Sequence, residues 1–272
     1  MGRISEEAKR KYSKRVEEYK KQIETSRRRE EAVLKTIEQR SDGAAQKRLA
    51  LADERLNLAS IFLLLNRISQ SMLSIKNDDF LNNARKSCYS SVIYLEQVVT
   101  DYLDAPFSEY ADHLEEIESL STSRRYQLIQ KLGFTIELVK DGFGENNKWR
   151  WSFVELEGRF AVVAKNILDL RSVIAGLDPR SEGYEDRLAH VRLVKDRLKH
   201  SGERYRERFE LSTNRVDDIK KGIDFLNALK RIHTLLGEPQ LADEIKRRAE
   251  VWKSRMEDEE RKSESSRSQS RG

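Results

Sequence analysis

The chain has 272 residues, of which 38% are apolar and 36% are charged, and its formal net charge is +5. Charged content this high, with only three prolines and twelve glycines, is typical of long helices with wide solvated faces. The apolar residues recur periodically, which excludes a disordered chain. A single cysteine, Cys88, excludes an intramolecular disulfide and a cysteine metal cluster, and it favours a cytoplasmic location.

We expect neither a secretory signal nor a membrane-spanning segment in this sequence. The N-terminus is charged from its first residues and lacks the apolar core of a secretory signal. The most apolar run, LNLASIFLLL at residues 56–65, is about half the roughly 20 residues that a spanning helix needs. We therefore expect no membrane span, and we interpret the run as the buried centre of a helix.

Residues 1–40 are predicted to form a basic helical arm. They hold 13 Lys or Arg against 8 Asp or Glu, and Arg27, Arg28 and Arg29 form a basic triplet. A stripe with alternating steps of four and three residues follows one side of the helix at Tyr12, Val16, Tyr19, Ile23, Ser26, Glu30, Val33 and Ile37. Because two of these positions are polar, the stripe would make a weak isolated coiled coil. The arm is expected to project into solvent or to lie loosely on the body.

A bundle body is predicted for residues 41–260. Ser41-Asp42-Gly43 has the residues of a helix break, after which the pattern resumes and continues to Ile75, so either two helices meet there or one helix of about 70 residues passes through. Three further helices are predicted from about Asp78 to Leu103, Phe107 to Ser119 and Arg124 to Lys140. The second is acidic, since residues 101–120 hold seven acids and no Lys or Arg.

The stretch from Trp149 to Leu177 is predicted to be the central buried helix. Its apolar stripe keeps steps of four and three residues throughout, and much of the remaining surface is apolar too, which is typical of a helix with several neighbours. Gly176 and Pro179 mark its end.

The last part of the chain is predicted to hold a long charged helix from about Glu182 to Leu236, and a final helix that reaches about Glu260. Residues 261–272, RKSESSRSQSRG, contain no apolar residue and are predicted to be a disordered Ser/Arg tail. No strand pattern of persuasive length is present. The predicted fold class is therefore all-α, an elongated antiparallel helical bundle with long coiled-coil-like helices.

The sequence does not favour an enzyme. Glu109, His113 and Glu116 share one helix face, but that helix is acidic all round, so a solvated face is the ordinary explanation. Cys88 lies on an apolar face, where cysteine usually behaves as a small hydrophobic residue. No nucleophile motif, phosphate loop or dinucleotide fingerprint is present. We therefore predict no catalytic residue, no metal site and no cofactor.

The loop Gly142–Trp151 is the strongest candidate for recognition of a partner. It brings Phe143, Trp149 and Trp151 close to Arg150, and aromatic residues and arginine dominate the energetics of interfaces. Trp151 lies away from the apolar stripe, so either it faces a partner or it packs under a neighbouring helix or the loop.

Two functions are consistent with these features. The leading hypothesis is a non-enzymatic structural or adaptor protein that acts through helix-mediated protein–protein interaction and self-associates. The motivation is that the arm and the long helix carry more amphipathic surface than one small body can cover. The alternative is a nucleic-acid- or ribosome-associated protein that uses the basic arm on phosphates.

Overall fold

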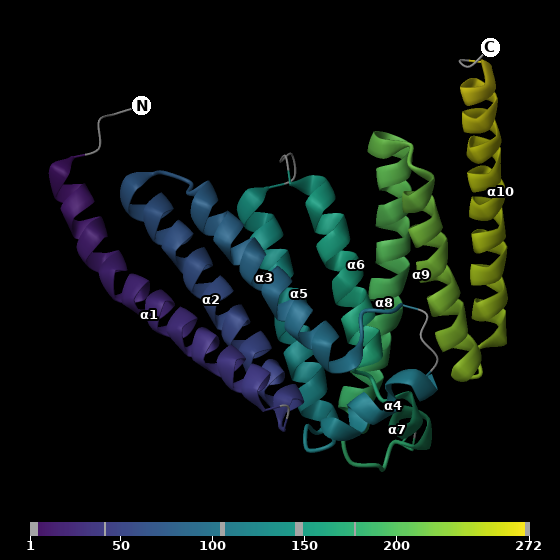
Figure 1. The fold of residues 1–272 in the computed structure, drawn as a ribbon, viewed down its shortest axis with the longest axis horizontal. Coiled ribbons are helices and arrows are strands. Elements are labelled where there is room, and N and C mark those ends of the chain that lie inside the picture. The colour runs from purple at the N-terminus through teal and green to yellow at the C-terminus, as the bar shows by residue number, and fades with distance from the viewer. Residues whose placement is uncertain (1–4, 41, 104–106, 145–148, 177, 270–272) are drawn as a thin grey trace. The chain divides into compact units, whose positions relative to one another are not determined.

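The computed structural model describes residues 5–40, 42–103, 107–144, 149–176 and 178–269, with side chains for all of these except 107–110 and 262–269. Within these ranges the chain forms ten α-helices and one π-helical turn, without a strand, and long helices that follow one another within a unit, such as α2 and α3 or α8 and α9, pack antiparallel (Figure 1). The predicted all-α class and antiparallel packing are therefore confirmed. The helices are α1 Glu6–Gln39, α2 Ala44–Leu73, α3 Asp78–Val99, α4 Phe107–Glu116, α5 Thr122–Phe143, α6 Arg150–Asn166, α7 Leu170–Ala175, α8 Tyr184–Arg208, α9 Val216–Leu235 and α10 Pro239–Gln269.

The contacts within the chain divide it into two compact units. Unit 1 comprises Met1–Thr100 and Asp112–Arg150, and unit 2 comprises Asp101–Ala111 and Trp151–Gly272. Helices α1, α2, α3 and α5 belong to unit 1, whereas α6 to α10 belong to unit 2.

The predicted arm is α1, and it lies along α2 as one half of a helical hairpin (Figure 1). The predicted stripe is confirmed, because all eight of its positions are buried or half-buried, whereas most residues around them are exposed. The two helices are separate: Gly43, with φ +64°, occupies the N-cap of α2 in a left-handed conformation that glycine adopts without strain. This settles the open question at Ser41-Asp42-Gly43, although Ser41 itself lies outside the described residues.

Helices α2, α3 and α5 form the core of unit 1. The apolar run at residues 56–65 is part of α2, and Leu56, Ala59 and Leu65 are fully buried. Helix α3 begins at Asp78, as predicted, and Asn77 is its N-cap, since the side chain of Asn77 accepts a hydrogen bond from the Phe80 amide. It ends at Val99, short of the predicted Leu103.

Helix α6 confirms the burial expected of the central stretch but not its length. Every residue from Phe160 to Leu168 is buried. The helix begins at Arg150 and ends at Asn166, and a short helix, α7, follows. The reason is local: Asp169 caps α7 by accepting hydrogen bonds from the amides of Arg171 (3.0 Å) and Ser172 (3.3 Å), which competes with continuation of the helix.

The single helix predicted from Glu182 to Leu236 is wrong, because α8 and α9 are two helices that pack against each other. The chain reverses through the π-helical turn Phe209–Thr213 and Asn214, whose φ of +48° is tolerated by asparagine. The corner is held by Asp218, which accepts hydrogen bonds from Arg208 and from the Thr213 hydroxyl. Neither interaction can be inferred from the heptad pattern.

Helices α8, α9 and α10 approach one another closely within unit 2. A Cβ atom added to Gly222 of α9 would lie 3.0 Å from the carbonyl oxygen of Gly202 in α8, and 3.3 Å from the ring of Trp252 in α10. The two glycines therefore let the α8 and α9 backbones come into contact. Helix α10 continues to Gln269, nine residues beyond the predicted end, so only residues 270–272 of the predicted disordered tail fall outside the described residues.

Candidate partner-binding surface

The polar positions in the α1 stripe are partnered across the hairpin. Glu30 is 6% exposed, and its carboxylate accepts hydrogen bonds from Arg55 Nε of α2 (2.7 Å) and from the hydroxyl of Tyr94 in α3. Burial, together with the hydrogen bond to Glu30, raises the pKa of Tyr94 to about 12. This cluster fixes the register of α1 on α2, since a shift along the helix would leave a buried charge without its partner.

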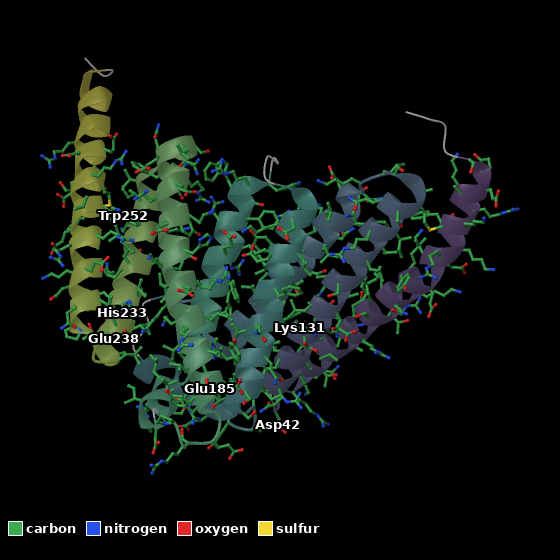
Figure 2. The ribbon with its side chains drawn as sticks, turned by 180° about the vertical axis from the view of Figure 1, so that it is seen from behind. Asp42, Lys131, Glu185, His233, Glu238 and Trp252 are labelled. Carbon is green, nitrogen blue, oxygen red and sulfur yellow. The ribbon has the colours of Figure 1, made fainter. Side chains whose placement is uncertain are left out.

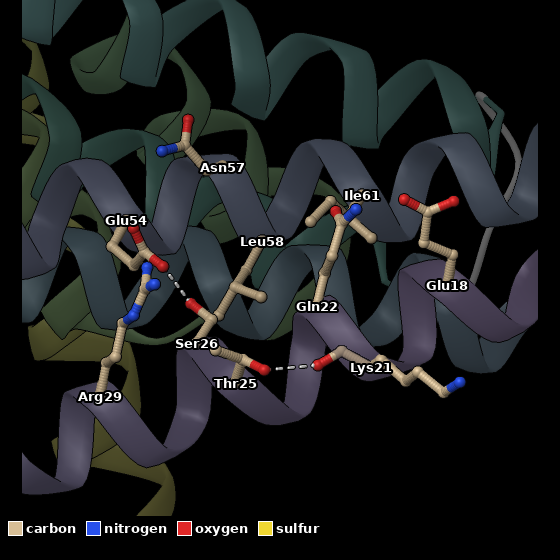
Figure 3. A pocket seen from close by; sticks show the side chains of 10 residues that line it. All are labelled: Glu18, Lys21, Gln22, Thr25, Ser26, Arg29, Glu54, Asn57, Leu58 and Ile61. Carbon is tan, nitrogen blue, oxygen red and sulfur yellow. Dashed lines mark hydrogen bonds between the residues drawn. The ribbon is translucent and has the colours of Figure 1, made fainter.

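A pocket of about 400 Å³ opens next to this cluster, between α1 and α2 (Figure 3). The hydroxyl of Ser26 donates a hydrogen bond to Glu54 across it, and Leu58 and Ile61 supply its apolar part. Charged and polar side chains complete the lining, which comprises Glu18, Lys21, Gln22, Thr25, Ser26, Arg29, Glu54, Asn57, Leu58 and Ile61.

Helix α5 continues this surface on the other side of α2. Lys131 Nζ donates hydrogen bonds to Asp53 (2.6 Å) and to Asn57 (2.9 Å), and Asn57 also lines the pocket. Lys131 is labelled in Figure 2, and Figure 1 shows that α2 and α5 run in the same direction in unit 1. Residues one to two turns further along both helices therefore continue the same edge.

Those further residues are apolar, and several of them are exposed. Phe134 of α5 is 65% exposed and Leu64 of α2 is 38% exposed, while Ile61 and Leu138 are half-buried. We call the pocket lining together with Leu64, Lys131, Phe134 and Leu138 the three-helix surface. Apolar side chains gathered in this way, with charged residues at the border, are typical of sites for other proteins.

This surface was not predicted from the sequence. The apolar run of α2 is apolar on all sides, so its periodicity cannot tell which side chains stay uncovered. A signal was available in Phe134, because it lies off the apolar stripe that the sequence shows along this helix at Tyr126, Ile129, Leu132, Ile136 and Val139.

The structure brings together two of the four residues predicted for partner binding. Phe143 is the last residue of α5, is 6% exposed, and lies 6.3 Å from the ring of Trp149 between centroids. Lys76 Nζ donates to the Phe143 carbonyl (2.7 Å), and the Arg85 guanidinium lies 4.4 Å from the centroid of the Trp149 ring. Both aromatic side chains are thus engaged within unit 1, and Trp149 precedes α6 rather than belonging to its stripe.

The other two residues belong to α6. Arg150 is exposed at the start of α6. Trp151 belongs to unit 2, where it is half-buried and the guanidinium of Arg204 in α8 lies 6.0 Å from its ring centroid. Residues 145–148 of the predicted recognition loop lie outside the described residues.

The basic triplet of α1 is exposed. Arg29 lines the pocket, and neither Arg27 nor Arg28 makes an ion pair with a described residue. Elsewhere on the outer side of α1, acids and bases pair along the helix, as Glu17 does with Lys21 at 3.1 Å. The triplet therefore presents three consecutive positive charges on the exposed part of the arm.

A second polar cluster joins three helices of unit 2. Glu238 precedes α10 and accepts hydrogen bonds from Lys195 of α8 (2.7 Å) and from His233 Nδ1 of α9 (2.6 Å). Its burial would raise the pKa of the carboxyl group, but these two hydrogen bonds lower it below 4.5. The cluster stabilises the α8–α9–α10 junction, and Figure 2 labels both Glu238 and His233.

Among the described residues, no three His, Cys, Asp or Glu side chains are grouped so that they could hold a metal ion. In the same part of the chain, no helix combines the length and the apolar character needed to cross a membrane. The side chain of Glu109, one of the three residues considered for a metal, lies outside the described set.

Comparison with known proteins gives a family. No curated protein and no solved structure shows a significant match to the chain. The model of the TP0443 family matches residues 8–260, which include every helix of the structure except α1's first two residues and the end of α10. The chain therefore belongs to the TP0443 family.

Proposed function

We propose that the protein is a non-enzymatic adaptor that binds a helical segment of a partner protein at the three-helix surface, and that it self-associates through its helices. The observation that carries this proposal is Phe134, which exposes 65% of its surface three residues after Lys131, the residue through which α5 is hydrogen-bonded to α2. An aromatic side chain buries 150–250 Å² when covered, so leaving it in water is costly unless a partner covers it.

The dimensions of the surface suit a helix. Asn57 and Leu64 are seven residues apart on α2, which corresponds to about 10 Å, or two turns of a bound helix. Amphipathic helices bind in apolar grooves through residues spaced by three, four and seven positions. Ile61, Leu64 and Phe134 would receive such residues, while Arg29 and Lys131 at the border would meet acidic groups.

The test compares two matched variants in affinity capture from the native cell. Phe134→Asp places a charge in the three-helix surface, whereas Leu211→Asp places one at an equally exposed leucine (66%) on unit 2. We expect one set of proteins to be lost with Phe134→Asp and kept with Leu211→Asp. If both variants retain the same proteins at the same yield, the three-helix surface is not the binding site.

A second candidate function rests on Arg27, Arg28 and Arg29. Because these charges are not compensated by described residues, the triplet would contact phosphates of a nucleic acid. Binding of a fluorescent RNA or DNA duplex should then weaken steeply with added salt and fall when all three arginines are changed to glutamine. A duplex that does not bind even at low salt would eliminate this function.

A further inference from the structure

We propose that self-association proceeds by exchange of α1: two copies open at Gly43, and α1 of each copy packs on α2 of the other. The inference rests on the proposed self-association and names its mechanism. In the exchanged form α1 and α2 would run on as one helix, and two such helices would pair antiparallel.

The first observation is that the stripes of α1 and α2 share one heptad phase. The α1 stripe ends with a step of four residues from Val33 to Ile37. Two heptads after Ile37 comes Leu51, and from there steps of three and four residues lead through Leu51, Glu54, Leu58, Ile61, Leu65 and Ile68. Of these, Glu54 bonds to α1, Leu58 and Ile61 line the pocket with α1, and the other three are buried. One straight helix would therefore carry both halves of the interface on a single side.

The second observation is the symmetry of the contacts. Ser26 pairs with Glu54, and Glu30 pairs with Arg55. The midpoints of these pairs fall at residue 40 and between residues 42 and 43, within three residues of Gly43. A two-fold axis at that point would pair the same residues between two straight antiparallel helices, so every contact of the hairpin is available to a dimer.

The third observation concerns what holds the hairpin closed. Of the 34 residues of α1, four are buried: Val16, Ile23, Ser26 and Glu30. Two of these are polar, so they specify the register more than they stabilise the helix pair. Because exchange preserves all of these contacts, the balance between hairpin and dimer depends mainly on the backbone at Gly43, whose left-handed φ is needed only in the hairpin.

Substitution of Gly43 changes that balance in a calculable way. A Cβ atom at this position would meet only Gln46 Oε1, at 3.8 Å, so alanine meets no steric obstacle there. Its cost is confined to the left-handed conformation, which L-residues adopt with difficulty. Each dimer forms from two hairpins, and both lose the strain of the left-handed alanine when they straighten. Gly43→Ala should therefore raise the dimerisation constant by about 30- to 800-fold. Gly43→Asn should have a smaller effect, because asparagine tolerates φ > 0.

The experiment first measures dimerisation of the full chain and of both Gly43 variants by sedimentation equilibrium. It then mixes two singly labelled copies in a Cys88→Ala background, one carrying Ser26→Cys and the other Glu54→Cys, and adds a short bis-maleimide. Since neither copy holds both cysteines, the Ser26–Glu54 cross-link forms only when α1 of one copy lies on α2 of the other. Copies carrying Leu211→Cys and Val251→Cys, both on exposed parts of unit 2, report random collision.

We expect a covalent heterodimer well above the collision control, increased by Gly43→Ala and less so by Gly43→Asn. A dimer that forms without this cross-link would overturn the exchange while self-association stands. A chain that stays monomeric, Gly43→Ala included, would overturn the exchange and the proposed self-association together. The adaptor site is tested independently by Phe134→Asp.

Discussion

The buried cluster of Glu30, Arg55 and Tyr94 gives a prediction in which changing one member destabilises the protein more than changing all three. Glu30→Leu removes the acceptor of both hydrogen bonds and leaves a guanidinium whose side chain is 24% exposed. Breaking a fully buried pair costs 3–5 kcal/mol, and partial access of water to Arg55 reduces this to about 2–3 kcal/mol. The triple change Glu30→Leu, Arg55→Leu and Tyr94→Phe leaves no unpaired polar group, so its free energy of unfolding should lie within about 1 kcal/mol of the wild type.

The assay is urea unfolding of the full chain followed by circular dichroism at 222 nm, with hydrogen exchange of the α1 amides to assign the loss to unit 1. Glu31→Leu is the matched control, because Glu31 is the exposed neighbour of Glu30 on the same helix. It should change stability by no more than about 0.5 kcal/mol. A triple variant that is as unstable as Glu30→Leu would refute the reasoning, since the loss would then come from shape rather than from unpaired charge.

Three further predictions concern single residues. Because the folded state holds the Tyr94 proton to about pH 12, stability should fall as pH rises from about 10 to 12, and absorbance at 295 nm should show one late-titrating tyrosine that is absent in Tyr94→Phe. Gly222→Ala should lower the urea midpoint, since the gain of about 1 kcal/mol in helix propensity is outweighed by overpacking against the Gly202 carbonyl. The pKa of Glu238 is lower in the folded protein than its usual value of 4.5, so the stabilisation that its carboxylate provides is present above pH 4.5 and is lost as the pH falls through the folded-state pKa. Glu238→Gln should therefore make the free energy of unfolding depend less on pH in this acid range.

Much of the helical architecture could be predicted from the sequence, because periodic burial leaves a direct trace in the order of residues. The α1 stripe is the clearest case, and its polar members Ser26 and Glu30 are buried like the apolar ones. The ends of helices were harder to predict. Asp169 and Asn214 interrupt helical patterns through local side-chain and backbone conformations that an apolar stripe does not encode.

The candidate site was harder to predict from the sequence than the helices were. Aromatic density pointed to Phe143 and Trp149, but these residues contact each other and the cations of Lys76 and Arg85 inside unit 1. The three-helix surface depends on which side of α2 remains uncovered once α1, α3 and α5 have packed, and that is a property of the tertiary structure. Of the residues in this surface, only Phe134 was recognisable in the sequence, because it lies off the apolar stripe of its helix.

The adaptor function is tested most directly by hydrogen exchange of the full chain with and without the partner that Phe134→Asp loses. If the partner's helix binds at the three-helix surface, amides of α2 around residues 57–64 and of α5 around residues 131–138 should exchange more slowly in the complex, while those of α9 and α10 should not change. Protection confined to unit 2, or no difference in these two segments of unit 1, would contradict the assignment.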